Sequence, residues 1–223
     1  WLALATIVMG AIGVLASQDL RKLVANLVIV SVGTLVALVA VQTVEASAAA
    51  IYYLVHSTMV TAALFILADL IGRQRGKVAD RITVGRPVTQ PILLGFGFVI
   101  AAVAAIGMPP LSGFIAKIWL LKATFNSEYG IVFWPLYLLA SLALLVGISK
   151  AGSTVFWHHK GNTNDSHEQE RVHPTQLAAL IVLLSSAPLM AIFAGPASEY
   201  ALNAATVLHD FRGTISAILE GGQ

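Results

Sequence analysis

The residue with the clearest potential for chemistry is Lys117, which lies in an apolar segment long enough to sit in a membrane. A lysine at the centre of a membrane helix costs roughly 2.5–3.5 kcal/mol, so it usually has a function. Ten residues earlier, the run Gly107-Met108-Pro109-Pro110 must break or kink the helix, because proline lacks a backbone N–H. An ionisable group beside a broken membrane helix indicates a proton or ion path.

A histidine is the second candidate within an apolar segment. His56 lies midway along IYYLVHSTMVTAALF, and an imidazole can pass a proton between its two nitrogens. Ser57, Thr58 and Thr61 follow it and could hold water molecules. Thr61 lies about 500° around the helix from His56, so Ser57 and Thr58 are better placed to serve it. The alternative for His56 is a hydrogen bond between helices without transport.

Composition identifies an all-α integral membrane protein. The chain has 223 residues, of which 57% are hydrophobic and 11% charged, and its mean hydropathy is +0.83. Soluble domains carry about 25% charged residues, and barrel strands would alternate in polarity. The absence of cysteine excludes disulfides and thiolate metal sites, and a net charge of +2 does not suggest nucleic acid. Because the chain starts inside an apolar run, we expect it to be the C-terminal part of a longer protein.

Six membrane segments are predicted, at about 1–17, 20–43, 46–72, 90–125, 131–157 and 173–194. Asp19 stands where it could cap the second helix. The fourth segment would measure ~54 Å as one helix, whereas the hydrocarbon core is ~30 Å thick. We therefore expect two half-helices joined near 107–112, with the break at Gly107, Pro109 and Pro110. Residues 158–172 would form a loop, and 195–223 a tail with a mildly amphipathic surface helix.

Lysine and arginine predict the topology, because they are enriched on the cytoplasmic side. The second and fourth loops carry Glu45 and Glu128 and no basic residue, so odd loops would be cytoplasmic and both ends of the chain external. Trp134 and Trp157 fall at opposite ends of the fifth segment, as interfacial anchors would. The basic residues of the odd loops and helix ends are Arg21, Lys22, Arg73, Arg75, Lys77, Arg81, Arg86, Lys150, Lys160 and Arg171.

Three other charges lie close to the membrane. Lys122, five residues beyond Lys117, could join a proton path or extend its stem to the external interface. Asp69 and Lys150 lie near the cytoplasmic ends of their helices and could be path residues or interfacial charges. Four further histidines show no recognisable metal-ligand spacing, so no metal site is expected; they are His158, His159, His167 and His173.

Four stretches resemble the antiporter-like subunits of Mrp-type Na+/H+ antiporters and of the membrane arm of respiratory complex I. PPLSGFIAKIWLLKATF resembles their broken twelfth helix, and SQDLRKLVANLVIVSVGTL a stretch written QxDIKRxLAYSSISQIG. IYYLVHSTMVTAALFILA resembles the helix YxLxHxxxxKAALFL. SKAGSTVFWHHKG is similar to the SRAGSTLFW motif of the D subunits of Mrp antiporters, which favours these over complex I subunits.

The resemblance spans about residues 1–195 and implies helices nine to fourteen of a fourteen-helix fold. Residues 1–157 would be the second of two inverted five-helix repeats, and 173–194 the final transmembrane helix. Family members carry protons along a polar axis at mid-membrane. The resemblance therefore assigns Lys117, His56, Lys22 and Lys150 to the proton path. The chain departs from the family at Thr61, where lysine is usual, and at Asn26-Leu27, where Tyr-Ser is usual.

The function expected from this resemblance is proton translocation within a multisubunit Na+/H+ antiporter of the bacterial cell membrane. Such a chain would be a transporter subunit rather than an enzyme, without a cofactor, working with other subunits, lipid, protons and Na+. One alternative is a proton-pumping subunit of NADH–quinone oxidoreductase or of a membrane hydrogenase. A second alternative, motivated by Thr61, is a structural scaffold subunit.

Overall fold

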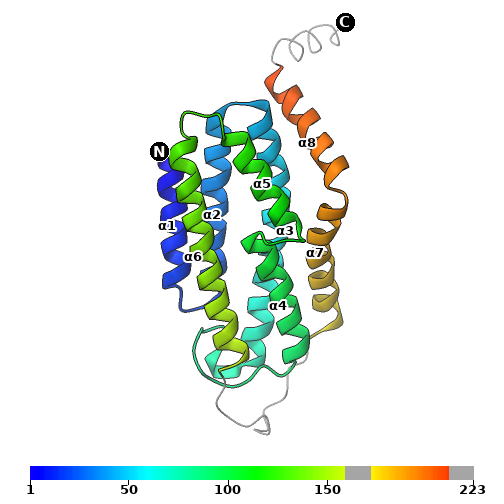
Figure 1. Cartoon of the computed structure of the whole chain (residues 1–223). Helices are drawn as coiled ribbons and strands as arrows, with labels where there is room; N and C mark the ends of the chain where they lie inside the picture. Colours follow the sequence, from blue (N-terminus) through cyan, green and yellow to red (C-terminus); the bar gives the residue numbers. More distant parts are fainter. Residues whose placement is uncertain (159–171, 211–223) are drawn as a thin grey trace, which may run out of the picture.

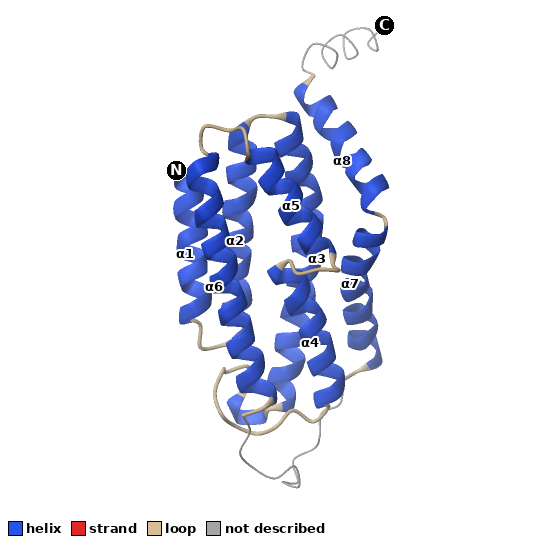
Figure 2. Cartoon of the chain, viewed as in Figure 1, coloured by secondary structure: helices blue, strands red, loops and turns tan. Residues whose placement is uncertain are grey.

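The computed structural model describes residues 1–158 and 172–210, and every regular element in these ranges is helical (Figures 1 and 2). The predicted all-α fold is thereby confirmed. The helices are α1 (Leu2–Ala16), α2 (Leu20–Val41), α3 (Val44–Gln74), the short 3₁₀ helix η1 (Gly76–Val78), α4 (Pro91–Ile106), α5 (Ser112–Thr124), α6 (Gly130–Phe156), α7 (Pro174–Ile192) and α8 (Ala194–His209).

Four of these helices are long and apolar enough to cross a membrane, namely α2, α3, α6 and α7. Helices α1 and α4 are also apolar but shorter. Glycines let α1 and α2 pack closely, because a β-carbon at Gly10 would lie 2.7 Å from Val30 Cγ2 and one at Gly33 2.9 Å from Ile7 Cγ1. Close approach of two helices at small residues such as glycine is typical of helices that associate in lipid.

The fourth predicted segment is interrupted as expected. Helix α4 ends at Ile106, and α5 begins at Ser112. Gly107 follows α4 with φ +75°, a conformation that glycine adopts without steric cost. The Pro109–Pro110 peptide bond is cis. Figure 2 shows the connecting loop crossing the bundle about midway between its two ends.

The loops are divided between the two ends of the bundle as the charge pattern predicts. Figure 1 places the start of α1, the α2–α3 turn and the end of α8 at one end of the bundle. The basic α1–α2 turn and the 75–90 loop lie at the other end, where Ile82 N donates to Gln18 O at 2.7 Å. Trp134 and Trp157 lie at opposite ends of α6, as expected. Most of the predicted 158–172 loop and residues 211–223 of the tail lie outside the described residues.

The 75–90 loop is built around a buried arginine. The Arg75 side chain is almost fully buried, with the residue 1% exposed. Its guanidinium donates to the carbonyl oxygens of Arg81 and Thr83, each at 2.6 Å, and to those of Ala79 and Arg86, each at 3.4 Å. The sequence suggested only a topological role for Arg75, whereas the structure shows that it organises this loop.

The N-terminus of α2 is capped differently from the prediction. Asp19 occupies the cap position, but its carboxylate makes no capping bond and instead pairs with Lys22 Nζ at 2.6 Å. The donors at the start of α2 bond to Asp80 of the 75–90 loop: Leu20 N to its carbonyl at 2.9 Å and Arg21 N to its carboxylate at 3.0 Å. The cap therefore also joins two loops, which no local sequence pattern indicates.

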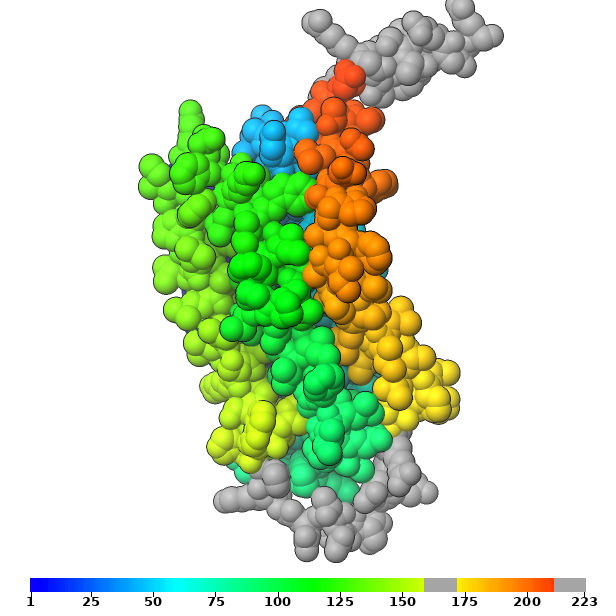
Figure 3. Space-filling view, turned by 45° about the vertical axis from the view of Figure 1, so that its right-hand side comes forward, coloured from blue at the N-terminus to red at the C-terminus, as the bar shows by residue number. Residues whose placement is uncertain are grey.

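Helices α7 and α8 form a strip along one side of the bundle (Figure 3). Ala201 and Ala205 of α8 pack against Ala48 of α3. At the level of the α7–α8 junction, the Tyr52 hydroxyl donates to Met190 O at 2.9 Å. The amphipathic helix predicted in the tail is thus present as α8, with one face packed against α3.

Candidate functional site

Lys117 of α5 reaches back to the end of α4. Its Nζ donates to the carbonyl oxygen of Ile106, the last residue of α4, and to Ser141 Oγ of α6 at 2.8 Å. Carbonyl groups at a helix C-terminus lack partners within the helix and carry partial negative charge. The break therefore creates an acceptor for the ammonium group at mid-bundle, and α6 supplies a second one.

Gly107 provides the space for this contact. A β-carbon at this position would lie 2.7 Å from both Cδ and Cε of Lys117. The glycine is thus required both by its positive φ and by the lysine stem that crosses it. The sequence predicted the break at Gly107, and the structure adds that the break and the lysine touch each other.

His56 of α3 lies against both half-helices, α4 and α5. Its ring is buried, and Nδ1 lies 2.8 Å from Ser112 Oγ, on the first turn of α5. The other ring nitrogen, Nε2, lies on the side of the Ala104 backbone in α4, next to Gly113. Gly113 permits this approach, since a β-carbon there would lie 2.1 Å from Ala104 O and 3.0 Å from His56 Nε2. His56 and Lys117 therefore both bind the broken ends.

These neighbours favour one tautomer of His56. A carbonyl oxygen only accepts hydrogen bonds, so a bond from Nε2 to Ala104 O requires the proton on Nε2. In that tautomer Nδ1 accepts from the Ser112 hydroxyl. A neutral imidazole held in this way has a proton on one side and a lone pair on the other, as a proton relay requires.

The predicted supporting hydroxyls do not bond to His56. Ser57 and Thr58 both donate to Leu54 O, and Thr61 donates to Ser57 O, so all three bond to their own helix. Thr58 is exposed on the outer face of α3. The hydroxyl that His56 contacts is Ser112, which sequence reasoning missed although it lies at the end of the break.

The other predicted lysines lie away from this centre. Lys22 is exposed at the end of the bundle with Asp19, and Lys150 is exposed on α6 near its C-terminal end. Lys122 is exposed on α5, five residues after Lys117, which turns it to a different side of the helix. The structure thus brings Lys117 and His56 together at the break and leaves the remaining three at the surface of this chain.

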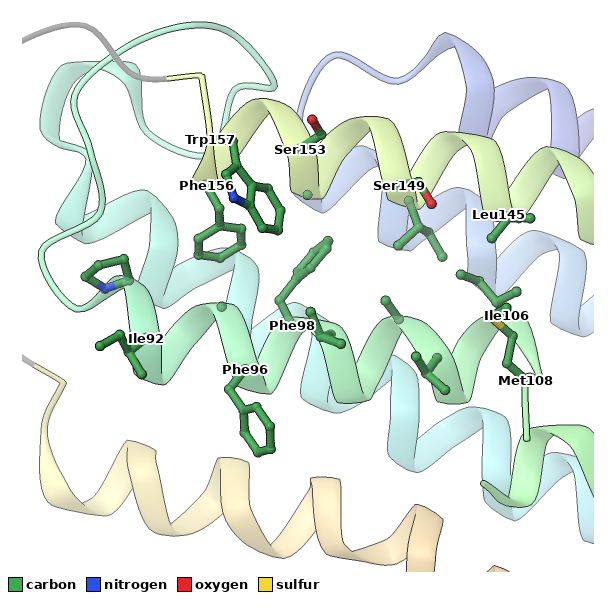
Figure 4. Close-up of a pocket in the computed structure, with 17 residues that line it drawn as sticks. Ile92, Phe96, Phe98, Ile106, Met108, Leu145, Ser149, Ser153, Phe156 and Trp157 are labelled. Atoms are coloured by element: carbon green, nitrogen blue, oxygen red, sulfur yellow. The ribbon is translucent and has the colours of Figure 1, made fainter. Parts of the chain in front are cut away.

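A groove of about 730 Å³ runs between α4 and α6 (Figure 4). It extends from Ile92 and Trp157 at one end to Ile106 and Met108 at the break. Its walls are mostly apolar, with Ser149 and Ser153 as the exceptions, so it offers few of the polar partners that ordered water needs. The groove therefore touches the break without offering a hydrated route to Lys117.

A second cavity, of about 1160 Å³, lies at the opposite end of the bundle. Its wall includes Lys122 of α5, Glu45 at the start of α3 and two indole rings, Trp119 and Trp134. Lys122 thus faces a partly polar cavity near the α8 end. In the part of the chain that the structure describes, no three histidine or acidic side chains gather as metal ligands would.

The fold and this site define a polytopic all-helical membrane protein with an interrupted helix around an ionisable centre. The family described as the transmembrane region of NADH:quinone oxidoreductase and Mrp antiporter matches residues 1–143, and the chain belongs to this family. The stretch that matches includes the helix break, Lys117 and His56.

Curated relatives are subunits of antiporters. The chain is 32% identical over 224 residues to the D subunit of a probable K(+)/H(+) antiporter from Rhizobium meliloti, with 87% of this chain and 40% of the relative covered. It is 33% identical over 185 residues to the D subunit of the Na(+)/H(+) antiporter from Bacillus subtilis, with 83% and 37% covered. The chain thus spans about two fifths of these relatives.

Solved structures show the same fold. A chain of the Mrp complex from Dietzia sp. DQ12-45-1b superposes with a TM-score of 0.82 at 22% identity, covering 97% of this chain and 48% of that one. A chain of respiratory complex I from Thermus thermophilus superposes with a TM-score of 0.79 at 21% identity, covering 93% and 43%.

Proposed function

We propose that this chain is part of a proton-translocating subunit of a multisubunit monovalent cation/proton antiporter, with Lys117 as its proton-carrying group. The observation that carries the proposal is the pair of bonds from Lys117 Nζ to Ile106 O and Ser141 Oγ at the helix break. The similarity to the D subunits of antiporters supports the transport class. In this assignment the chain crosses the membrane six times, with α4 and α5 as one crossing.

Lys117 suits this role because both of its partners tolerate either protonation state. The charged ammonium donates to Ile106 O and to Ser141 Oγ. The neutral amine can still donate one hydrogen bond and can accept one from the Ser141 hydroxyl. Neither partner is a carboxylate that would fix the positive charge permanently. A proton gained from the external side can therefore leave again with little rearrangement.

His56 links Lys117 to the other side of the break. The neutral imidazole, held between Ser112 and Ala104, can accept a proton on Nδ1 and release one from Nε2. We assign it the inward step of the path, and Lys22, Lys150 and Lys122 to entry and exit positions at the surface. We propose that polar groups of packing partners connect these lysines to the centre.

The partners and cation follow from the relatives. The named relatives include subunits of both a K(+)/H(+) and a Na(+)/H(+) antiporter, so we propose an alkali cation, with Na+ first. The partners would be the remaining subunits of the complex, in a bacterial plasma membrane. The likeness to complex I gives a second candidate, a proton-pumping subunit of a redox complex. Neighbouring genes for small antiporter subunits would support the first candidate, and genes for redox subunits the second.

Removal of the Lys117 amine tests the proposal. In the complete complex, reconstituted in vesicles, Lys117→Ala should abolish cation-dependent proton movement while the complex still assembles. Lys77→Ala, which removes an exposed loop lysine of η1, is the control for loss of one positive charge and should leave transport intact. Transport by Lys117→Ala at the rate of the control would refute the assignment.

A further inference from the structure

A cluster of buried hydroxyl groups next to Lys117 has no part in the path described so far. The Tyr53 hydroxyl of α3 donates to Ser31 Oγ of α2 at 3.1 Å. The hydroxyl groups of Thr34 of α2 and Tyr137 of α6 also lie beside it and interact with it electrostatically. Tyr53 and Tyr137 are buried in the bundle, whereas Ser31 is partly exposed. The cluster therefore joins α6, α3 and α2 in one line of hydroxyls.

Lys117 adjoins this line at Tyr137. Its Nζ lies 5.7 Å from the centroid of the Tyr137 ring. Tyr137 precedes Ser141, the second acceptor of Lys117, by one helical turn, so both residues lie on the same side of α6. The ammonium group therefore lies next to Tyr137, the α6 residue at which the line of hydroxyls begins.

Packing alone does not explain the hydroxyl of Tyr137. One turn earlier on α6, the Phe133 ring stacks on the Tyr137 ring at 5.4 Å with an interplanar angle of 10°. A ring without a hydroxyl group thus packs directly against Tyr137. Burial of a hydroxyl is unfavourable unless it is hydrogen-bonded, and a phenylalanine would avoid that cost. The tyrosine is consistent with a role for the oxygen.

We propose that Tyr137 and Tyr53 form a hydroxyl relay that carries protons between Lys117 and Ser31 on α2. The relay rests on the proposed function, because it requires Lys117 to exchange a proton. It would open a route across the bundle, toward the partly exposed side of α2, in addition to the His56 route. Neither tyrosine was singled out by the sequence, although Tyr53 precedes His56 by about one helical turn.

The step is balanced without ionising any hydroxyl. A proton leaves Lys117 and reaches the Tyr137 oxygen through water, because Nζ lies 5.7 Å from the centroid of the Tyr137 ring and donates to other partners. The original Tyr137 proton moves to the Tyr53 oxygen, and the Tyr53 proton moves to Ser31 Oγ. Ser31 passes its own proton to water or to a polar group lying against α2. Each hydroxyl both donates and accepts, as this sequence requires, and rotation about the C–O bonds restores the starting state.

The competing explanation is that these hydroxyls only fasten three helices together. The neighbouring tyrosine supplies a matched control for that role. The Tyr52 hydroxyl also bonds across helices, to Met190 O of α7, but this partner is a carbonyl, which cannot pass a proton onward. A Tyr52→Phe substitution therefore removes a fastening bond from the same helix without removing a relay position.

The test measures cation-driven proton flux in vesicles containing the complete complex, with thermal stability of the complex as a second readout. Tyr53→Phe, Tyr137→Phe and the double variant are compared with Tyr52→Phe and with Lys117→Ala. The relay predicts about a tenfold or larger loss of flux in each relay variant. The double variant should lose no more than the worse single variant, because the two residues act in series.

The outcomes separate the two proposals. Flux in Tyr53→Phe and Tyr137→Phe equal to that of Tyr52→Phe, with Lys117→Ala inactive, would overturn the relay and leave the proposed function standing. Full activity of Lys117→Ala would overturn the proposed function itself. The relay predicts that the three single phenylalanine variants lose equal stability and that only Tyr53→Phe and Tyr137→Phe lose flux.

Discussion

Lys117 and Arg75 are two cations that the fold withdraws from water, and both bind backbone carbonyl oxygens. Lys117, at the helix break, binds one carbonyl and one hydroxyl. Arg75, in the 75–90 loop, binds four carbonyls and is almost completely buried. Within the described residues, neither forms an ion pair with a carboxylate.

The difference between the two sites lies in how firmly each proton is held. A guanidinium stays protonated in proteins, and its planar fork suits several acceptors at once. Burial lowers the pKa of Arg75, and the nearby Asp80 charge opposes that shift. Arginine nevertheless remains a permanent charge that fastens a loop. The lysine has fewer partners and one exchangeable hydroxyl beside it, so its proton can leave. If Lys117 has the proposed role, the number and type of acceptors separate a structural cation from a transporting one.

The largest expected effect comes from giving the break a permanent charge. Lys117→Arg keeps the positive charge and can still donate to Ile106 O, but it cannot release its proton. We expect flux in vesicles to fall by about a hundredfold or more, a loss typical of a missing proton-transfer group. Assembly of the complex, measured by co-purification of its subunits, should persist. Near-normal flux in this variant would show that a permanent charge at position 117 is enough for transport. Lys117 would then no longer differ from Arg75 in needing to release its proton.

The converse change at Arg75 should affect stability and spare transport. Arg75→Ala leaves four carbonyl oxygens of the loop without their donor, and hydrogen bonds to charged groups contribute about 1.5–3 kcal/mol each. We expect the complex to unfold at a lower temperature and the 75–90 loop to become sensitive to protease. Arg75→Lys should restore only part of the loss, because an ammonium group cannot span the fork.

Transport per assembled complex is the measurement that separates Arg75 from Lys117. If Arg75→Ala complexes melt like the wild type but carry fewer protons, Arg75 belongs to the path and the comparison fails. Unchanged flux per folded complex, with a lower melting temperature, would show that Arg75 stabilises the fold and takes no part in transport.

The sequence predicted what depends on local pattern and hydrophobic length. The helices at 20–43, 46–72 and 131–157 were expected from long apolar runs, and α2, α3 and α6 match them within two residues. The break at Gly107 followed from the conflict between a 36-residue segment and the thickness of a membrane. Lys117 was recognisable because a charge in an apolar run is rare. The number of crossings and the inverted-repeat assignment stay predictions.

The sequence could not predict contacts made between distant segments. Ser112 and Ser141 are ordinary serines until the fold brings one to His56 and the other to Lys117. Arg75 was one of five basic residues counted for topology around the same loop, and only the path of the chain from 76 to 86 gives it four acceptors. Burial and partner geometry, rather than residue type, distinguish these residues.

The smallest expected effect concerns the cap of α2, where sequence and structure differ. Asp80→Ala removes the carboxylate that accepts from Arg21 N, and loss of a capping bond costs about 1 kcal/mol. Asp19→Ala removes the carboxylate at the cap position itself, which pairs with the exposed Lys22 and should cost less. A thermal unfolding series of the two variants checks the order. A larger loss for Asp19→Ala would show that the local cap residue matters more than the bond to Asp80. It would also weaken the view that the 75–90 loop holds two helix ends together, because Asp80 connects that loop to α2.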